Sequence, residues 1–181
     1  RICNKKGMIC LERVNHACYD ETNMEWRTER DSGKAWRYIM KVVLERYHGL
    51  GNDYVVFDPN RNELELREEN VRMICDRNEG LGADGILEGP ILKEEGMYVK
   101  VWNPDGSESE TSGNGVRIFA KYLKDADYVQ KKHFTLYTEN GPVEVTFLNE
   151  EGSRLRVSMG KLSFWSDDIP VTGERREVIN E

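Results

Sequence analysis

The stretch NPDGSESETSGNGVRIFAKYL, residues 103–123, constrains the fold most, because its pattern changes abruptly in the middle. Small polar residues run up to Ser112-Gly113-Asn114-Gly115, and an amphipathic helical pattern begins at Val116. The predicted helix carries Val116, Phe119, Ala120 and Leu123 on one face, and Arg117, Lys121 and Lys124 on the other. A helix with one broad apolar face must pack against another layer, so the rest of the chain has to supply that layer.

The segments around this helix mostly resemble β-strands. Residues 40–60 are predicted to form a strand, a glycine-rich turn, a second strand and a closing turn. Further strands are predicted over residues 85–92, 97–102, 133–138, 142–148 and 154–159, and a second helix over residues 66–77. Because strands dominate and many neighbours are joined by short turns, we expect an α+β fold with a mixed, mostly antiparallel sheet.

Composition restricts the partners of the protein. A net charge of −7 over 181 residues argues against nucleic acid and anionic membranes as partners. No apolar run approaches the roughly 18 residues that a membrane-spanning helix needs. The four cysteines are too sparse for a disulfide framework, and those near the N-terminus lack the spacing of a structural zinc site. We therefore expect a cytoplasmic protein that binds no nucleic acid, membrane or metal.

Residues 1–39 differ from the rest, because they show no sustained period of either a strand or a helix. We expect them to be a disordered or non-native leader. The pair Trp36-Arg37 supports a non-native origin, since the codons TGG and AGG together contain GGAGG, a bacterial ribosome-binding sequence. Met40 would then be the natural start, and an Arg37 codon other than AGG would contradict this hypothesis.

Two glycine-rich motifs lie upstream of the helix. GLGADG, residues 80–85, matches the G-x-G-x-x-G pattern of dinucleotide-binding turns, but a helix is predicted before it and a strand after it, which is the reverse of the required order. HGLGND, residues 48–53, is best interpreted as a tight turn in which Gly49 and Gly51 have positive φ angles. The alternative is that Asn52 presents its amide to a ligand.

The turn Ser112-Gly113-Asn114-Gly115 has two interpretations. The free N–H groups and dipole of the following helix would form an anion site suited to a carboxylate, and the two glycines would allow the ligand to approach the backbone closely. A proton-transfer group at Ser112 would feel the same field. The other interpretation is an ordinary serine N-cap. The residues alone favour neither.

Four motifs in order resemble the diaminopimelate epimerase family: HGLGNDYVVFD, ICDRNEGLGADGIL, VWNPDGSESETSGNGVRIFAKYL and LRVSMGKLSFW. The resemblance runs from Met40 to about Pro170. It implies two pseudo-symmetric α/β lobes, each with a sheet wrapped round a central helix, and the helix from Val116 would be central to the first. It also implies epimerisation of an amino-acid α-carbon without pyridoxal phosphate or metal. Two cysteines would face each other across the substrate, one as base and one as acid.

The resemblance implies roles for individual positions. Asn52 and Asn103 stand where side chains contact the substrate, and Gly113 and Asn114 stand in the turn whose N–H groups hold its α-carboxylate. Gly85 stands where some members have a glutamine that contacts the substrate, so this side-chain contact is absent here.

Ser112 departs from the family, which usually has a catalytic cysteine at this position. An alcohol is several pKa units harder to ionise than a thiol, whose pKa is about 8.5, and each unit corresponds to about 1.4 kcal/mol. A helix terminus contributes only about 0.3–2 kcal/mol, which does not close the gap. Ser112 is therefore expected to be a poor substitute for a thiolate, although it can donate or relay a proton, orient water or support one-sided chemistry.

The resemblance also predicts a domain division: a leader over residues 1–39, a first lobe over residues 40–132, and the opening strands of a truncated second lobe over residues 133–181. The missing part of the second lobe would carry the opposing cysteine. We accordingly expect the N-terminal portion of a cofactor-independent epimerase, inactive alone, that belongs to the conversion of LL- to meso-diaminopimelate in lysine biosynthesis. A homodimer is a candidate assembly of the full-length protein.

Two alternatives remain open. One is a racemase or dehydratase that acts on another amino acid through the hydroxyl of Ser112. The other is a paralogue that binds a ligand without catalysis.

Overall fold

The computed structural model describes residues 3–11, 18–20, 40–110, 112–160, 163–169 and 171–178. Its elements in chain order are β1 (Cys3–Leu11), β2 (Cys18–Asp20), β3 (Met40–Gly49), β4 (Asn52–Phe57), α1 (Glu68–Cys75), β5 (Ile86–Lys93), β6 (Gly96–Trp102), β7 (Glu108–Ser109), α2 (Gly113–Asp125), β8 (His133–Thr138), β9 (Gly141–Phe147) and β10 (Leu155–Val157). No helix within these ranges is long and apolar enough to cross a membrane.

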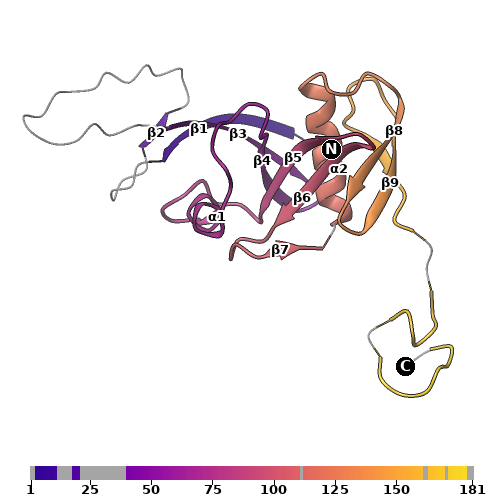
Figure 1. The fold of residues 1–181 in the computed structure, drawn as a ribbon. Helices are drawn as coiled ribbons and strands as arrows, with labels where there is room; N and C mark the ends of the chain where they lie inside the picture. The colour runs from indigo at the N-terminus through magenta and orange to yellow at the C-terminus, as the bar shows by residue number, and fades with distance from the viewer. Residues whose placement is uncertain are drawn as a thin grey trace, which may run out of the picture.

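The strands of the described ranges join into one ten-stranded sheet. Its order is β10-β9-β8-β6-β5-β4-β3-β1-β2, with β7 paired to β6 on the side. The pairs β4–β5 and β6–β8 are parallel, and the other pairs are antiparallel. The sheet curls round α2 (Figure 1). These observations confirm the predicted α+β class and the mixed, mostly antiparallel sheet.

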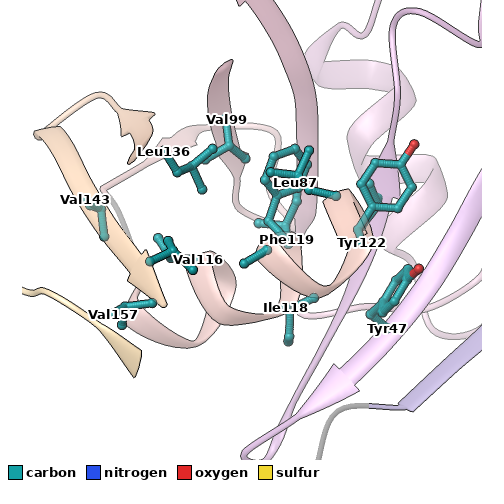
Figure 2. Close-up of a cluster of buried hydrophobic side chains, with 14 of the residues drawn as sticks. Tyr47, Leu87, Val99, Val116, Ile118, Phe119, Tyr122, Leu136, Val143 and Val157 are labelled. Atoms are coloured by element: carbon teal, nitrogen blue, oxygen red, sulfur yellow. The ribbon is translucent and has the colours of Figure 1, made fainter. Parts of the chain in front are cut away.

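Helix α2 lies in the hollow of this sheet and provides the centre of the larger core. Its buried side chains include Val116, Phe119 and Leu123, as the periodicity predicts. They pack in one cluster with Leu87 of β5 and Leu136 of β8 (Figure 2). Burying a side chain of this size stabilises the fold by about 1.5–3 kcal/mol. The packing therefore holds α2 in place relative to several strands at once.

A second core lies on the other face of the sheet, beneath α1. Alternate residues of β4 divide between the two cores: Val55 and Phe57 pack with α1, whereas Tyr54 and Val56 pack on the side of α2. This alternation is the period-2 pattern of a strand that is buried on both faces. Helix α1 falls within the predicted range 66–77.

The later part of the chain continues the same sheet, and one expectation there needs correction. Strands β8, β9 and β10 continue the same sheet and bury Leu136, Val145 and Val157 in the core around α2. Residues on both sides of the predicted boundary between 132 and 133 therefore share one sheet and one core; that residues 133–181 are the opening strands of a second lobe stays a prediction. Helix α2 begins at Gly113 rather than Val116. Strand β5 includes Gly89-Pro90, and its register with β6 shifts between Glu88 and Ile91.

The region before Met40 also differs from expectation. Residues 3–11 form β1, which pairs with β3 in antiparallel register from Cys3↔His48 to Leu11↔Met40, and residues 18–20 form β2. The local sequence pattern did not indicate these two strands. That residues 1–39 are a disordered or non-native leader stays a prediction. The rest of the predicted leader, including Trp36-Arg37, lies outside the described residues.

Beyond β10, the chain leaves the sheet. Residues 163–169 and 171–178 extend away from it (Figure 1) and are linked by an isolated bridge between Trp165 and Glu177.

Candidate active site

Strand ends and the start of α2 define one end of the sheet. Strand β4 begins at Asn52, and the parallel strand β5 begins at Ile86. The antiparallel strand β6 ends at Trp102, which pairs with Ile86, so Asn103 leaves the sheet at this same end. Neighbouring strands are about 4.8 Å apart. Sheet topology thus places Asn52 and Asn103 at the same end of the sheet.

A tight hairpin turn fixes the position of Asn52. The turn consists of Leu50, with φ 58°, and Gly51, with φ 92°. Two-residue hairpin turns of the mirror type require positive φ at both central positions. Gly49 stays in β3 and pairs with Asn52, so the expectation of a positive φ at Gly49 is wrong, and exposed Leu50 takes that conformation instead.

The GLGADG loop, residues 80–85, delivers Asp84 to the same place. The backbone N–H groups of Leu81 and Gly82 donate to the carbonyl of Ile74 in α1, which folds the loop back against the helix. The N–H of Asp84 then donates to the carbonyl of Asp53 at 2.8 Å. The loop follows a helix and precedes a strand, which confirms the predicted order and is the reverse of the order in a dinucleotide-binding turn.

Three polar side chains from three elements form a continuous chain of hydrogen bonds at this edge. Asn114 Nδ2 donates to Asn52 Oδ1 at 2.8 Å, across 62 residues of sequence. Asn52 Nδ2 donates to Asp84 Oδ2 at 3.0 Å, and the same oxygen accepts the backbone N–H of Asp53 at 3.0 Å. The structure thus brings Asn52 and Asn114 into direct contact.

Arg46 and Arg77 contact the carboxylates of Asp53 and Asp84, next to these hydrogen bonds. Asp53 accepts hydrogen bonds from Arg46 and from Arg77, and Arg77 also donates to Asp84 Oδ1 at 2.7 Å. Burial alone would raise the pKa of Asp53, but the hydrogen bonds and charges of Arg77 and Arg46 outweigh it and hold the pKa below its ordinary value. Sequence reasoning missed all four residues. The sequence feature that could have indicated them is that Asp53 and Asp84 each belong to one of the two glycine-rich motifs.

Ser112 caps the N-terminus of α2. Its backbone is extended, with φ −86° and ψ 128°, and its Oγ accepts from Gly115 N at 3.3 Å. Its carbonyl accepts from Val116 N at 2.9 Å. The N-cap interpretation is therefore confirmed. It does not exclude an anion site, because an α-helix has no internal acceptor for its first N–H groups, here those of Gly113 and Asn114.

The backbone of Gly113 is closely covered by two side chains. A Cβ added at Gly113 would lie 3.1 Å from an Arg117 guanidinium nitrogen and 3.2 Å from Met159 Sδ. Arg117 also donates to the carbonyl of Gly113 at 2.8 Å. Its positive charge therefore lies beside the helix N-terminus, where it adds to the field of the helix dipole. Sequence reasoning placed Arg117 on the polar face of the helix without recognising that this face leads back to Gly113.

Asn103 closes the NPDGS turn. Its Nδ2 donates to Ser107 Oγ at 3.0 Å, and its backbone N–H donates to the carbonyl of Ser107 at 2.8 Å. Within the described ranges, no hydrogen bond joins Asn103 to Asn52 or Asn114. Its substrate contact stays a prediction.

Cys75 lies in the α1 core rather than at this edge. Its side chain is buried, and burial raises the pKa of the thiol to about 11. A thiol in such surroundings is structural rather than reactive. No group of three or more histidine, cysteine, aspartate or glutamate side chains within the described part of the chain is arranged to hold a metal ion.

Comparison with known proteins identifies the family to which this chain belongs. The family model described as Diaminopimelate epimerase matches residues 45–165, which is more than half of the chain. The chain belongs to the diaminopimelate epimerase family.

Individual relatives agree with this assignment. Diaminopimelate epimerase 2 of Nostoc sp. is 48% identical over 137 residues, which cover 75% of this chain and 48% of that protein. Diaminopimelate epimerase of Methanothermobacter thermautotrophicus is 37% identical over 145 residues, which cover 77% of this chain and 51% of that protein. The chain thus spans about half the length of the curated relatives it matches. Among solved structures, a protein of the phenazine biosynthesis PhzF family from Enterococcus faecalis aligns with a TM-score of 0.43 and 20% identity, over 56% of this chain and 35% of that one.

Proposed function

We propose that the N-terminal end of α2 is one half of the substrate site of a cofactor-independent amino-acid epimerase, whose reaction converts LL- to meso-diaminopimelate in lysine biosynthesis. The observation that carries the proposal is the contact between Asn114 and Asn52 beside the capped helix start at Ser112. This contact joins two residues that the family resemblance assigns to the substrate, although they are far apart in sequence.

The helix start suits the charge that develops in such a reaction. Removal of the α-proton leaves a carbanion whose negative charge spreads into the α-carboxylate. The N–H groups of Gly113 and Asn114 and the guanidinium of Arg117 would face that carboxylate with positive potential. Fixed dipoles of this kind stabilise a charge that grows in the transition state without having to reorganise.

Epimerisation needs two proton-transfer groups on opposite faces of the α-carbon, one that removes the proton and one that delivers another. Ser112 would stand on one face. Because its alcohol resists ionisation, we propose that it delivers or relays a proton rather than acting as the base. The opposing group would lie in a second lobe, as the family resemblance implies. The 181 residues alone would then form an inactive half of the site.

The first experiment incubates the 181-residue chain with LL-diaminopimelate in deuterated water and follows deuterium at the α-carbon by NMR. We expect no exchange above that in buffer, because the group that removes the α-proton would lie in the second lobe. Clear exchange would show that the chain is catalytically complete and would contradict the half-site proposal.

The second experiment uses the full-length protein and compares Ser112→Cys with Ser112→Ala. The thiol is far easier to ionise, so Ser112→Cys should raise the epimerase rate at least about tenfold, which corresponds to about 1.4 kcal/mol of barrier. Ser112→Ala should lower it. Activity on another amino acid that depends on the Ser112 hydroxyl would favour the racemase or dehydratase alternative. Ligand binding without turnover in all three proteins would favour the non-catalytic paralogue.

The proposal extends to the setting of the protein. We propose a cytoplasmic enzyme that binds no nucleic acid and that forms a homodimer when full length. The acidic net charge of −7 supports the absence of nucleic-acid binding. Light scattering of the full-length protein would test the dimer.

A further inference from the structure

The contact between Asn52 and Asn114 involves two primary amides, and two amides can bond in either direction. Each side chain has an oxygen that accepts and an NH₂ group that donates, and rotation by 180° exchanges them. If Asn114 donates to Asn52, the carbonyl oxygen of Asn114 points away from Asn52. If Asn52 donates to Asn114, the NH₂ group of Asn114 points away instead. These two arrangements would recognise opposite chemical groups, so some neighbour must select one.

Asp84 is the neighbour that can make this selection. A carboxylate accepts hydrogen bonds and donates none. Because Asp84 Oδ2 lies 3.0 Å from the side-chain nitrogen of Asn52, this amide must turn its NH₂ group toward Asp84 and its oxygen toward Asn114. Asn114 therefore has to donate, as its 2.8 Å bond to Asn52 Oδ1 requires. The carbonyl oxygen of Asn114 is left on the far side.

Asp84 is itself held on three sides. Its Oδ2 also accepts the backbone N–H of Asp53 at 3.0 Å, and its Oδ1 accepts from Arg77 at 2.7 Å. Its backbone N–H is bonded to the carbonyl of Asp53. The carboxylate is thus fixed by the sheet and by the GLGADG loop, with the charge of Arg77 beside it, before any ligand arrives.

We infer that Asp84 is a positioning residue that fixes the direction of the Asn52–Asn114 hydrogen bond, so that the pair offers an acceptor at Asn114 and the second N–H of the Asn52 amide as a donor. An α-amino acid carries an ammonium donor and a carboxylate acceptor on the same carbon, and this arrangement complements both. The identity of the ligand rests on the proposed function, whereas the direction of the bond does not.

The direct test is NMR on the deuterated, isotope-labelled 181-residue chain, through scalar couplings across hydrogen bonds. We expect a coupling from Asn114 ¹⁵Nδ2 to Asn52 ¹³Cγ and one from Asn52 ¹⁵Nδ2 to Asp84 ¹³Cγ. A coupling in the reverse direction, from Asn52 ¹⁵Nδ2 to Asn114 ¹³Cγ, would overturn the inference. This measurement needs neither a ligand nor a variant.

A matched pair of variants tests the cause. Asp84→Ala and Asp53→Ala each remove a carboxylate that bonds Arg77, but only Asp84 accepts from the Asn52 side chain. In Asp84→Ala the side-chain amide signals of Asn52 and Asn114 should double or broaden as both directions become populated, and in Asp53→Ala they should stay single. Asp84→Asn, which still offers one acceptor oxygen, should restore single signals. Unchanged amide signals in folded Asp84→Ala would overturn the inference.

Titration with LL-diaminopimelate separates this inference from the proposed function. If the chain binds it, Asp84→Ala should bind about 3–10-fold more weakly, the usual range for one lost hydrogen bond. Equal affinity in the variant would contradict a role of the bond direction in recognition. If neither the unmodified chain nor the full-length protein binds LL-diaminopimelate, the proposed function is contradicted. The scalar couplings across the hydrogen bonds still decide whether Asp84 fixes the direction of the Asn52–Asn114 bond.

Discussion

A hydrogen-bond network centred on an aspartate lies near each end of helix α2. The two networks differ in how many of their polar groups are bonded within the protein. Near the C-terminal end, the side chain of Asp58 is only 4% exposed and accepts the hydroxyls of Tyr122 at 2.5 Å and Tyr128 at 2.8 Å. Near the N-terminal end, the side chain of Asp84 is 32% exposed. The first network is enclosed in the protein, whereas the second reaches the surface.

The buried network also has partners for its remaining acceptor positions. Asp58 Oδ1 accepts the backbone N–H and the side-chain amide of Asn60, at 2.8 and 2.9 Å. Arg61 lies 3.5 Å from Asp58 and 3.2 Å from buried Glu45. At the other end of α2, the chain of bonds stops at half-buried Asn114 and at helix N–H groups that have no acceptor inside the helix. A satisfied, buried carboxylate thus indicates a structural role, whereas a fixed network with polar groups left at the surface indicates recognition of a ligand.

Replacing Asp58 should have the largest effect on stability. Asp58→Ala leaves the hydroxyls of Tyr122 and Tyr128 without their acceptor and removes one of the two carboxylates beside Arg61, and breaking a buried network of this kind costs about 3–5 kcal/mol. Asp84→Ala should cost only about 1 kcal/mol, because water can reach the groups that lose their partner. Urea unfolding followed by circular dichroism measures both. Equal losses in the two variants would contradict the distinction between the networks.

Alkaline pH should act on the buried network. Burial, helped by the hydrogen bond to Asp58, raises the pKa of Tyr122 above its ordinary value. In the unfolded chain Tyr122 releases its proton near pH 10, while the folded protein retains it. Its contribution to stability is therefore complete below about pH 10 and falls as the pH rises further. Tyr122→Phe should flatten the alkaline limb of the stability curve, and an unchanged limb would show that this tyrosine is not responsible.

Acid should act on the network near the N-terminal end of α2, and the effect should be smaller. The pKa of Asp53 is lowered in the folded state because its arginine partners outweigh burial. Its contribution to stability is present above the unfolded pKa of about 3.9 and is lost as the pH falls through the lower folded value. Asp53→Asn should flatten this acid limb and leave the alkaline limb as it was. Stability measured from pH 2 to 5 in both proteins is the test.

Local patterns predicted much of the fold but not the long-range pairings. The alternation in residues 133–138 predicts a strand, yet nothing local indicates that β8 pairs in parallel with β6 and joins the core around α2. The pattern predicts a start of α2 at Val116 rather than at Gly113, because glycine costs about 1 kcal/mol in a helix and Gly113 and Gly115 therefore resemble a turn. The Ser112 cap offsets part of that cost.

The candidate site was predictable only in part for a similar reason. Motif resemblance named Asn52 and Asn114, but their contact depends on the hairpin turn, on the placement of β4 and on the packing of α2. The role of Asp84 could not be predicted from local sequence, because it depends on a loop that returns from α1 to β4. A single sequence shows the residue types of such a site, and the fold decides which of them meet.

The most direct test of the central claim is a titration of the ¹⁵N-labelled 181-residue chain with LL-diaminopimelate at up to several millimolar, followed by amide NMR. A half-site at the N-terminal end of α2 predicts that the backbone signals of Gly113 and Asn114 and the side-chain signal of Asn52 shift together and saturate. The signals of residues around Asp58 should stay in place. Absence of any shift at Gly113, Asn114 and Asn52, or shifts of equal size around Asp58, would contradict the account.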